Sequence, residues 1–338
     1  MTYYVYISVA AENKILIFKM EPETGKLLFQ EGVELGGAPG PLAVDPNREL
    51  LYAGIRSNRE ISSFRIDQST GSLSLIGTVS LDADPCYLST DRRGNFLLSA
   101  YYGAGVAAVH PIGKDGAVGS PPIEWRSTAE RAHCIRTAPS NQFVFVPHTA
   151  GPNLIFQFKF DENTGALTPN AVPKVIPEEG AGPRHFCFHP SKDILYFSNE
   201  QGCSVTAYHF DTSAGTLAPF QTISTLPDDF DGDNSCAQIH ITPNGKFLYV
   251  SNRGHDSIAG FSIDSGTGRL ISIGQQQTEA IPRAFTIDPT GNFLFAGGQA
   301  SGRLASYRID PQTGALSPLD TYTIGKQSLW VLIIGQPD

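Results

Sequence analysis

The chain has 338 residues and a formal net charge of −9 at pH 7. This charge argues against nucleic acid and anionic membranes as partners, because both repel an acidic surface. The chain lacks a run of 18 apolar residues and a basic stretch at its start, so neither a membrane-spanning helix nor a signal peptide is predicted.

The composition favours short strands joined by tight turns. Gly (34) and Pro (24) are abundant, and Phe (20) and Tyr (12) are residues that suit strands. No segment keeps an apolar period of 3.6 residues over three turns, so we expect almost no helix. The five cysteines contain no Cys-x-x-Cys pair. We therefore expect free thiols and a cytoplasmic protein.

A strand followed by a glycine turn and then by Leu or Val recurs along the whole chain. The first copies are residues 15–27 and 61–73. The turn glycines are Gly25, Gly71, Gly116, Gly165, Gly215, Gly268 and Gly314, of which the copy at Gly116 is the weakest. They are separated by 46, 45, 49, 50, 53 and 46 residues, which indicates an internal repeat of one structural unit.

A hairpin is the second repeated feature, and it precedes the glycine turn in each unit. Six copies are complete, at residues 44–52, 90–98, 138–145, 189–196, 242–249 and 288–295. The seventh is divided, with its first strand at 328–334 and its second at 3–7. Each unit therefore has four strands, and the divided unit closes a ring. The predicted fold is all-β: a single seven-bladed β-propeller domain over residues 1–338, closed by pairing of the N- and C-terminal strands.

Polar residues recur where the inner strand of each blade begins. Aligned six residues before the hairpin turn, these positions hold Gly40, Cys86, His133, Arg184, Ala237 and Arg283. The adjacent second strands end at Arg56, Tyr101 with Tyr102, His148, Asn199 with Glu200, Asn252 with Arg253, and Gln299. In an antiparallel blade both sets lie at the same mouth of the central channel. Converging charged groups in a concavity predict a small-molecule site.

Structural roles compete with this interpretation. Arg184 and Arg283 could form salt bridges between blades, His133 could be a hydrogen-bonded core histidine, and Glu200 could serve to neutralise the arginines. Arg56 and Arg253 stay open between the two roles. His185 and His240 lie one and three positions further into their strands, where a structural role is favoured more strongly.

The acidic segment 228–234 does not have the spacing of a calcium-binding loop, so we expect a solvated loop at the channel mouth. The sequence contains no GxSxG, P-loop, HExxH or GxGxxG motif. Serine-hydrolase, nucleotide-binding and zinc-protease functions therefore have no support from local motifs.

Several of these stretches resemble the bacterial seven-bladed-propeller 6-phosphogluconolactonases, a superfamily that includes the fungal carboxy-cis,cis-muconate lactonizing enzymes. The matching stretches are residues 180–185, 188–190, 239–243, Pro282 with Arg283, and the strand at Trp330. The resemblance extends over the whole chain. The family's proposed catalytic set falls on His133, Arg184, Glu200 and Arg283, although residues 131–134 depart from the usual glycine-rich approach to His133.

The resemblance implies hydrolysis of 6-phospho-D-glucono-1,5-lactone in the pentose phosphate pathway, with no metal or organic cofactor. Arginines suit an anionic lactone substrate, and His133 or Glu200 would be the base. Substrate-binding roles are expected for His185, Arg253, Asn199, His240 and Arg56. The alternatives are a muconate-type cycloisomerase or another lactonase, and a non-catalytic binding scaffold. The expected assembly is a monomer or weak homo-oligomer.

Overall fold

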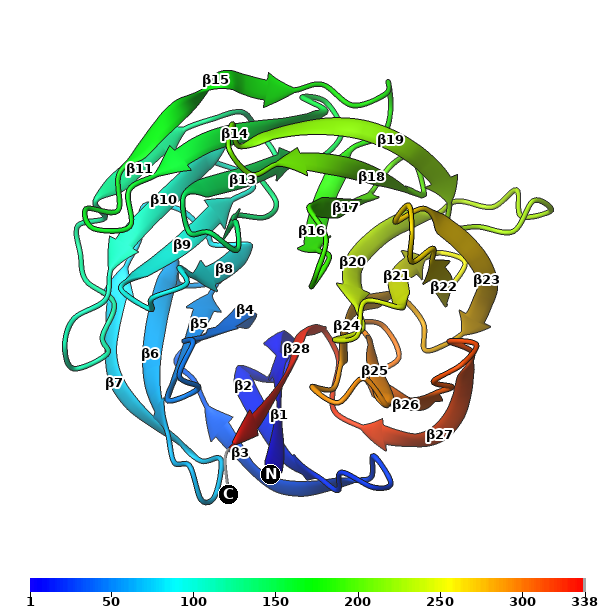
Figure 1. Ribbon diagram of the computed structural model, residues 1–338. Helices are drawn as coiled ribbons and strands as arrows, with labels where there is room; N and C mark the ends of the chain where they lie inside the picture. Colours follow the sequence, from blue (N-terminus) through cyan, green and yellow to red (C-terminus); the bar gives the residue numbers. More distant parts are fainter. Residues whose placement is uncertain (337–338) are drawn as a thin grey trace.

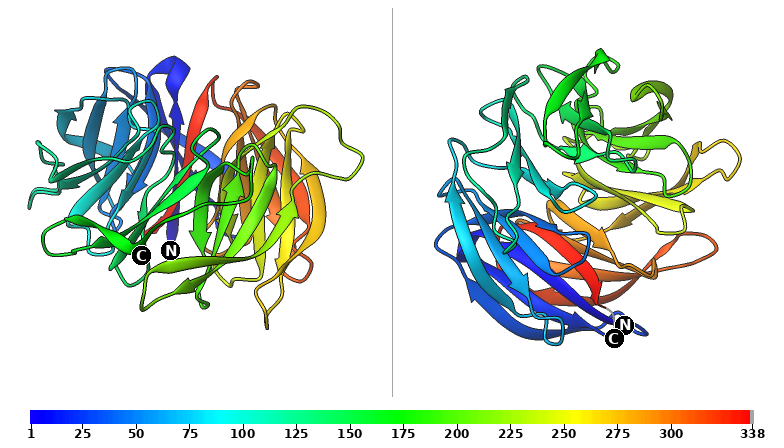
Figure 2. Two further views of the ribbon diagram at one scale, coloured as in Figure 1. Left: turned by 90° about the horizontal axis from the view of Figure 1, so that it is seen from above. Right: turned by 60° about the vertical axis from the view of Figure 1, so that its left-hand side comes forward.

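Seven four-stranded antiparallel sheets surround a central channel (Figure 1). The computed structural model describes residues 1–336, which form 28 strands and one short 3-10 helix, η1 (Ala10–Glu12). The sheets stand around the ring like blades, and their strands run between its two faces (Figure 2). The predicted seven-bladed β-propeller with almost no helix is confirmed. No helix of the described chain is long or apolar enough to cross a membrane.

Every blade repeats the same strand order from the channel to the rim. The innermost strands are β4 (Pro39–Val44), β8 (Tyr87–Thr90), β12 (Arg136–Thr137), β16 (Pro183–Phe188), β20 (Ser235–Ile241), β24 (Pro282–Ile287) and β28 (Ser328–Gln336). The second strands are β5 (Leu50–Ile55), β9 (Phe96–Tyr101), β13 (Phe143–His148), β17 (Ile194–Asn199), β21 (Phe247–Arg253), β25 (Phe293–Gly298) and β1 (Thr2–Val9). The third strands are β6 (Glu60–Ile66), β10 (Val106–Pro111), β14 (Leu154–Phe160), β18 (Ser204–Asp211), β22 (Ser257–Ile263), β26 (Arg303–Ile309) and β2 (Lys14–Met20). The outermost strands are β7 (Leu73–Ser80), β11 (Glu124–Ser127), β15 (Leu167–Val175), β19 (Thr216–Ser224), β23 (Leu270–Gln277), β27 (Leu316–Thr323) and β3 (Leu27–Glu34).

Pairing of β1 with β28 closes the ring. The two strands run antiparallel, with Val5 opposite Ile333 and Ile7 opposite Val331. Both strands lie in one sheet with β2 and β3, as the divided hairpin predicted. This pairing completes the four-stranded sheet, so the ring has no break where the chain begins and ends.

The repeated glycines form the seams between blades. All seven have positive φ, a conformation that side chains with a Cβ rarely adopt. A Cβ on Gly71 would collide with the ring of Tyr4 in the preceding blade, and a Cβ on Gly314 would collide with Phe247. The other five meet the first residues of the neighbouring second strand in the same way, at Phe293, Leu50, Phe96, Phe143 and Ile194. The repeat therefore marks a contact made once per blade around the whole ring.

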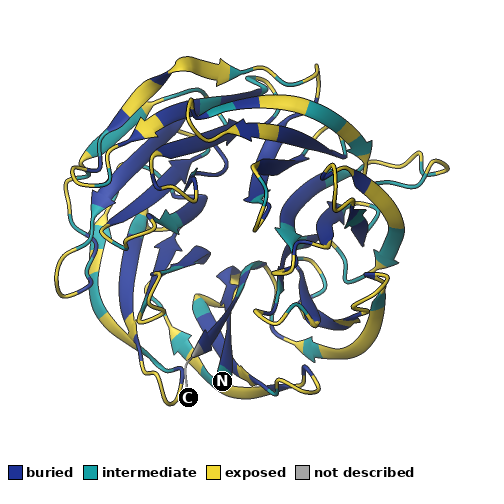
Figure 3. Ribbon diagram, in the orientation of Figure 1, coloured by how far each residue is buried: buried dark blue, intermediate teal, exposed yellow. Residues whose placement is uncertain are grey.

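Burial falls from the channel to the rim (Figure 3). The second strands are almost wholly buried, whereas an outermost strand such as β7 is exposed or half-buried along its length. Aromatic rings fill the space between sheets; Phe145 of β13 meets Phe186 of β16 edge-on, with ring centroids 6.1 Å apart. Apolar burial of this kind is the main stabilising term and holds the inner strands in place.

The third blade departs from the expected pattern. An isolated bridge between Ile112 and Val118 spans the turn at Gly116. The outermost strand β11 begins only at Glu124. Pro121 and Pro122 lie between them. Proline has no N–H to donate to a sheet. The strand that was predicted directly after Gly116 therefore begins only after these two prolines.

Candidate active site

All seven blades contribute to one pocket at the mouth of the channel. The pocket is narrow, with a cavity volume of about 10 Å³, and it opens to solvent. Each blade supplies a residue near the start of its inner strand: Gly40, Cys86, His133, Arg184, Gln238, Arg283 and Trp330. Five of the six aligned entry positions are therefore brought together. The sixth, Ala237, is replaced by its neighbour Gln238.

β-Bulges at the strand entries aim these side chains. In β16, Pro183 lies opposite Asn199 and His185 opposite Ser198, so Arg184 is the extra residue. In β24, Arg283 is the extra residue in the same way. A bulge breaks the alternation of side chains between the two faces of a strand. Consequently the consecutive residues Arg184 and His185 both line the pocket.

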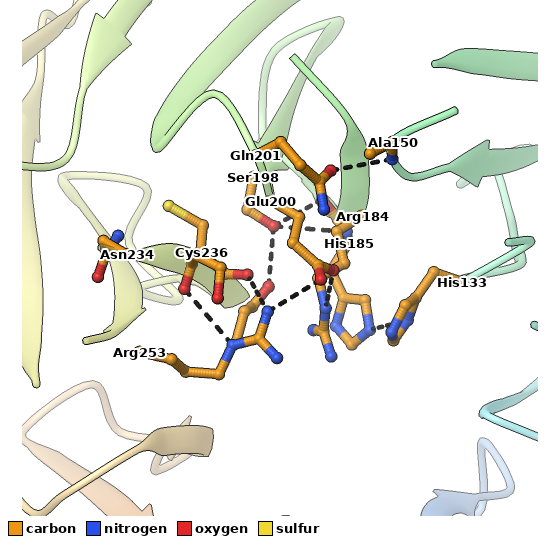
Figure 4. Close-up of polar contacts among 12 residues, drawn as sticks. His133, Ala150, Arg184, His185, Ser198, Glu200, Gln201, Asn234, Cys236 and Arg253 are labelled. Carbon is orange, nitrogen blue, oxygen red and sulfur yellow. Dashed lines mark hydrogen bonds and ion pairs between the residues drawn. The ribbon is translucent and has the colours of Figure 1, made fainter. Parts of the chain in front are cut away.

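Glu200 lies between two arginines just beyond the end of β17 (Figure 4). Its Oε2 is 2.9 Å from Arg184 Nε, and its Oε1 is 3.2 Å from Arg253 Nη2. The side chains of Arg184, Arg253 and Glu200 are only 2, 14 and 15 % exposed. In addition, Arg253 Nη2 donates to the carbonyl oxygen of Cys236 (2.8 Å), which fixes the guanidinium at the entry of β20.

Arg184 retains unused hydrogen-bonding capacity. Its Nη1 is buried and has no hydrogen-bond partner among the described residues. Burial, together with the charge of Arg253, lowers the pKa of Arg184 to about 9, against the opposing effect of Glu200. A buried donor without a partner destabilises the folded state unless a ligand accepts a hydrogen bond from it. Arg184 is thus suited to bind an oxygen of a ligand.

Two buried imidazoles meet beside these arginines (Figure 4). His185 Nε2 lies 3.3 Å from His133 Nδ1, so one nitrogen donates and the other accepts. Burial is the main cause that holds the pKa of each ring well below 6.5, and the charge of Arg184 lowers both further. Both rings are therefore neutral at neutral pH, and a neutral imidazole has a lone pair that can accept a proton.

The remaining arginines give the pocket an excess of positive charge. Arg283 forms no ion pair with the described residues, and burial with the charge of Arg253 lowers its pKa to about 10. Arg56 lines the pocket but is paired with Asp84 at 2.5 Å. Three guanidinium groups, on Arg184, Arg253 and Arg283, thus face the single carboxylate of Glu200, a local excess of two positive charges.

Two expected substrate-binding residues lie elsewhere. The Asn199 side chain is buried within its blade, where Nδ2 donates to the hydroxyls of Ser204 (2.9 Å) and Thr206 (2.8 Å). His240 lines a different cavity, further along the channel, and its ring contacts Phe285 edge-on. Neither side chain is part of the pocket lining, and Glu200 and Arg253 are not part of it either; these two are connected to the pocket by the ion pair of Glu200 with Arg184.

The sequence-based interpretation missed Gln238 and Trp330 as pocket residues. Gln238 replaces Ala237 because β20 has a bulge between Cys236 and Ile239, which moves the inward-facing position by one residue. Trp330 lies on β28, whose entry could not be aligned because its hairpin is divided between the two ends of the chain. Gln238 could have been predicted as a pocket residue only by identifying the Cys236–Ile239 bulge from the sequence.

The acidic segment 228–234 contributes no residue to the pocket. It contacts the turn after β21 instead, where Phe230 meets His255 with ring centroids 4.8 Å apart. Among the described residues, no group of three His, Cys, Asp or Glu side chains is arranged to hold a metal ion. All five cysteines are free thiols, as expected.

Comparison with known proteins identifies relatives over the full length of the chain. Residues 3–333 match the family model described as "Lactonase, 7-bladed beta-propeller". A 6-phosphogluconolactonase of Pectobacterium carotovorum is 36% identical over 335 residues, which cover 99% of both chains. A 6-phosphogluconolactonase of Yersinia pestis is 36% identical over 333 residues and 98% of both chains.

Solved structures share the architecture. A protein from Bacteroides fragilis, named a candidate 6-phosphogluconolactonase, aligns with a TM-score of 0.90 at 26% identity, over 99% of this chain and 98% of its own. A periplasmic gluconolactonase of Pseudomonas aeruginosa aligns with a TM-score of 0.92 over 100% of both chains. At 23% identity, the second likeness concerns the fold alone.

Proposed function

The chain belongs to the lactonase family of seven-bladed β-propellers, and we propose that it hydrolyses 6-phospho-D-glucono-1,5-lactone to 6-phosphogluconate. The names of the full-length relatives support hydrolysis of a sugar lactone. The phosphorylated substrate, the residue roles and the pathway are parts of the proposal. The reaction is that of the pentose phosphate pathway.

The observation that carries the proposal is the local excess of two positive charges in a chain whose net charge is −9. A phosphate monoester carries close to two negative charges at neutral pH. Guanidinium groups bind phosphate through paired N–H donors in a fixed planar arrangement. Arg283, which lines the pocket and forms no ion pair with the described residues, would hold the phosphate group together with Arg253.

Ring opening requires a water molecule, a base and a donor for the developing oxyanion. We assign the donor to Arg184, whose buried Nη1 has no hydrogen-bond partner within the described part of the chain. His133 is assigned as the base because its imidazole lines the pocket and, being neutral, has a lone pair that can take the proton of the water as the oxygen bonds to the lactone carbon. The bond from that carbon to the ring oxygen then breaks, and the same proton is returned to the departing oxygen.

Glu200 is less suited to be the base than the sequence suggested. Its two carboxylate oxygens lie against Arg184 and Arg253. Both oxygens are engaged by guanidinium groups, and Glu200 is not part of the pocket lining, so it is poorly placed to take a proton from a water molecule in the pocket. We propose that Glu200 orients the two arginines, and that His185 orients His133 through their hydrogen bond.

Assays on three compounds test this proposal: the phosphorylated lactone, glucono-1,5-lactone without phosphate, and a carboxymuconate. The expected result is hydrolysis of the phosphorylated lactone far above its spontaneous rate, weaker action on glucono-1,5-lactone, and none on the muconate. Arg184→Gln should remove the activity, whereas Arg303→Gln, in an exposed ion pair with Glu279, should retain it. Absence of acceleration on any lactone would overturn the proposal, and turnover of the muconate would favour the cycloisomerase.

The proposal places the protein in the cytoplasm, where its substrate is made. The five free thiols support this location, since disulfides are rare there. It also assigns a monomer or weak homo-oligomer as the working form. In support, one chain supplies pocket residues from all seven blades, so no second copy is needed to complete the site.

A further inference from the structure

The central channel contains a second cavity on the far side of Trp330. Trp330 is the residue that lines both cavities. Its ring contacts those of Tyr87 (centroids 5.3 Å apart) and His185 (6.0 Å), and these three rings lie across the channel. The second cavity, here called the lower chamber, has a volume of about 490 Å³. It extends to the turns that join inner and second strands.

Arg136 on β12 is one of three arginines that line the lower chamber, the others being Arg92 and Arg48. Arg48 Nη1 donates to the carbonyl oxygen of Gly335 at 2.6 Å. Arg136 Nη1 donates to the carbonyl oxygen of Phe186 (3.1 Å), and the Arg136 guanidinium lies 5.9 Å from the Phe186 ring centroid. No carboxylate of the described chain forms an ion pair with it. The carbonyl contact uses one of the five N–H groups of the side chain, so donors remain for a ligand.

Arg92, in the turn after β8, is the second of these arginines. Its Nε donates to Ala138 O and its Nη2 to Thr137 O, both at 3.2 Å, and it forms no ion pair with the described residues. Burial and the nearby charge of Arg136 lower its pKa to about 10. Arg92 thus contacts the carbonyl of Thr137, the residue next to Arg136, and both guanidinium groups line one chamber, so an anion in the chamber would be attracted by both.

The two aspartates that also line the chamber are already bound by backbone donors. Asp45 accepts N–H groups from Asn47, Glu49 and Leu50 at 2.7–2.9 Å. Asp91 accepts N–H groups of its own turn, and also the side-chain amide of Asn141 at 2.9 Å. Because both carboxylates stabilise turns, neither is directed to Arg92 or Arg136 as a counter-ion.

We propose that the lower chamber is a second anion site, which binds a phosphate group between Arg92 and Arg136. Paired guanidinium groups match the geometry of phosphate oxygens. A volume of about 490 Å³ lies in the range of small-molecule sites, so the phosphate is either free or carried by a small metabolite. The site is separate from the upper pocket and does not depend on the reaction proposed there.

Equilibrium dialysis with radiolabelled inorganic phosphate tests the proposal by counting sites. The wild type should bind two equivalents, one in each cavity. Arg136→Gln and Arg92→Gln should each lose one equivalent or weaken it at least tenfold, whereas Arg283→Gln should affect only the other. Arg93→Gln is the matched control, since Arg93 is in the same turn as Arg92 but is exposed and paired with Glu162.

The readouts separate the possible outcomes. Unchanged phosphate binding in both Arg136→Gln and Arg92→Gln would overturn the proposal, as would an equal loss in Arg93→Gln. Near-ultraviolet circular dichroism of each variant shows whether it is folded, and Arg92→Gln replaces Arg136→Gln if the latter is not. Tighter binding of glucose 6-phosphate than of inorganic phosphate at this site, with no binding of glucose, would identify the occupant as a phosphorylated metabolite.

Discussion

Replacement of Glu200 by glutamine tests the charge balance of the upper pocket most directly. Glutamine keeps the size of the side chain but removes its negative charge. The carboxylate is 2.9 Å from Arg184 and 3.2 Å from Arg253. Without it, two guanidinium groups that are 2 and 14 % exposed lose their shared counter-ion. We expect Glu200→Gln to be strongly destabilising.

The size of the effect follows from the two distances. At an effective dielectric constant of about 20, the two contacts attract by roughly 11 kcal/mol in total. Much of this offsets the cost of burying the charges, and removal of one partner from a buried pair costs about 3–5 kcal/mol. Unfolding entropy near 2.1 cal/mol/K per residue then gives a fall in Tm of about 4–7 °C for a chain of this length.

Differential scanning calorimetry with and without phosphate is the appropriate measurement. Glu279→Gln is the matched control, because Glu279 pairs with Arg303, which is 56% exposed, and such a pair contributes about 1 kcal/mol or less. Added phosphate should raise the Tm of Glu200→Gln more than that of the wild type, since the anion replaces the missing charge. Equal losses in the two variants, or no added effect of phosphate, would refute the reasoning.

Three further predictions concern the same pocket. His133→Gln should lower kcat about 10²–10⁴-fold with little change in KM, measured on the phosphorylated lactone, and an unchanged kcat would exclude His133 as the base. Arg283→Gln should raise KM for the phosphorylated lactone but not for glucono-1,5-lactone; equal effects on both would remove the phosphate-binding role. Acidification should destabilise the fold below pH 6.5, because buried His133 and His185, whose pKa values are lowered, stay neutral while the unfolded chain takes up protons. The expected loss is about 1.4 kcal/mol per pH unit for each histidine, read from urea unfolding at pH 7.0 and 5.5, and a smaller slope is expected in His185→Gln.

The repeat made the architecture predictable from the sequence. Seven glycine turns at near-constant spacing identified seven blades because each glycine makes the same contact with a neighbouring blade. The divided hairpin predicted the pairing of β1 with β28. The outermost strand of the third blade was the exception, since Pro121 and Pro122 displace it to Glu124.

The site was less predictable, because side-chain direction depends on local irregularities. Alternation along a strand would place Arg184 and His185 on opposite faces, yet the bulge in β16 turns both to the pocket. Because of a bulge in β20, Gln238 lines the pocket at the position where the alignment had placed Ala237. The position of Asn199 next to Glu200 in the sequence did not reveal that its amide is hydrogen-bonded within its own blade. Bulges depend on how two strands pair and are not visible in the sequence of one strand alone.

Closure of the ring by β28 has a consequence for how the protein is made. A ribosome releases β1 to β3 first, and this sheet lacks its inner strand until β28 follows, 294 residues after the end of β3 (residue 34 to residue 328). Until then the edge of β1 is open to pairing with other chains, which is a risk of aggregation during synthesis. The same strand carries Leu329 and Trp330 into the pocket. The pocket is therefore completed only when the ring closes. A chain whose translation stops before β28 would have an unpaired strand edge and an incomplete pocket, and we expect it to aggregate and to lack activity.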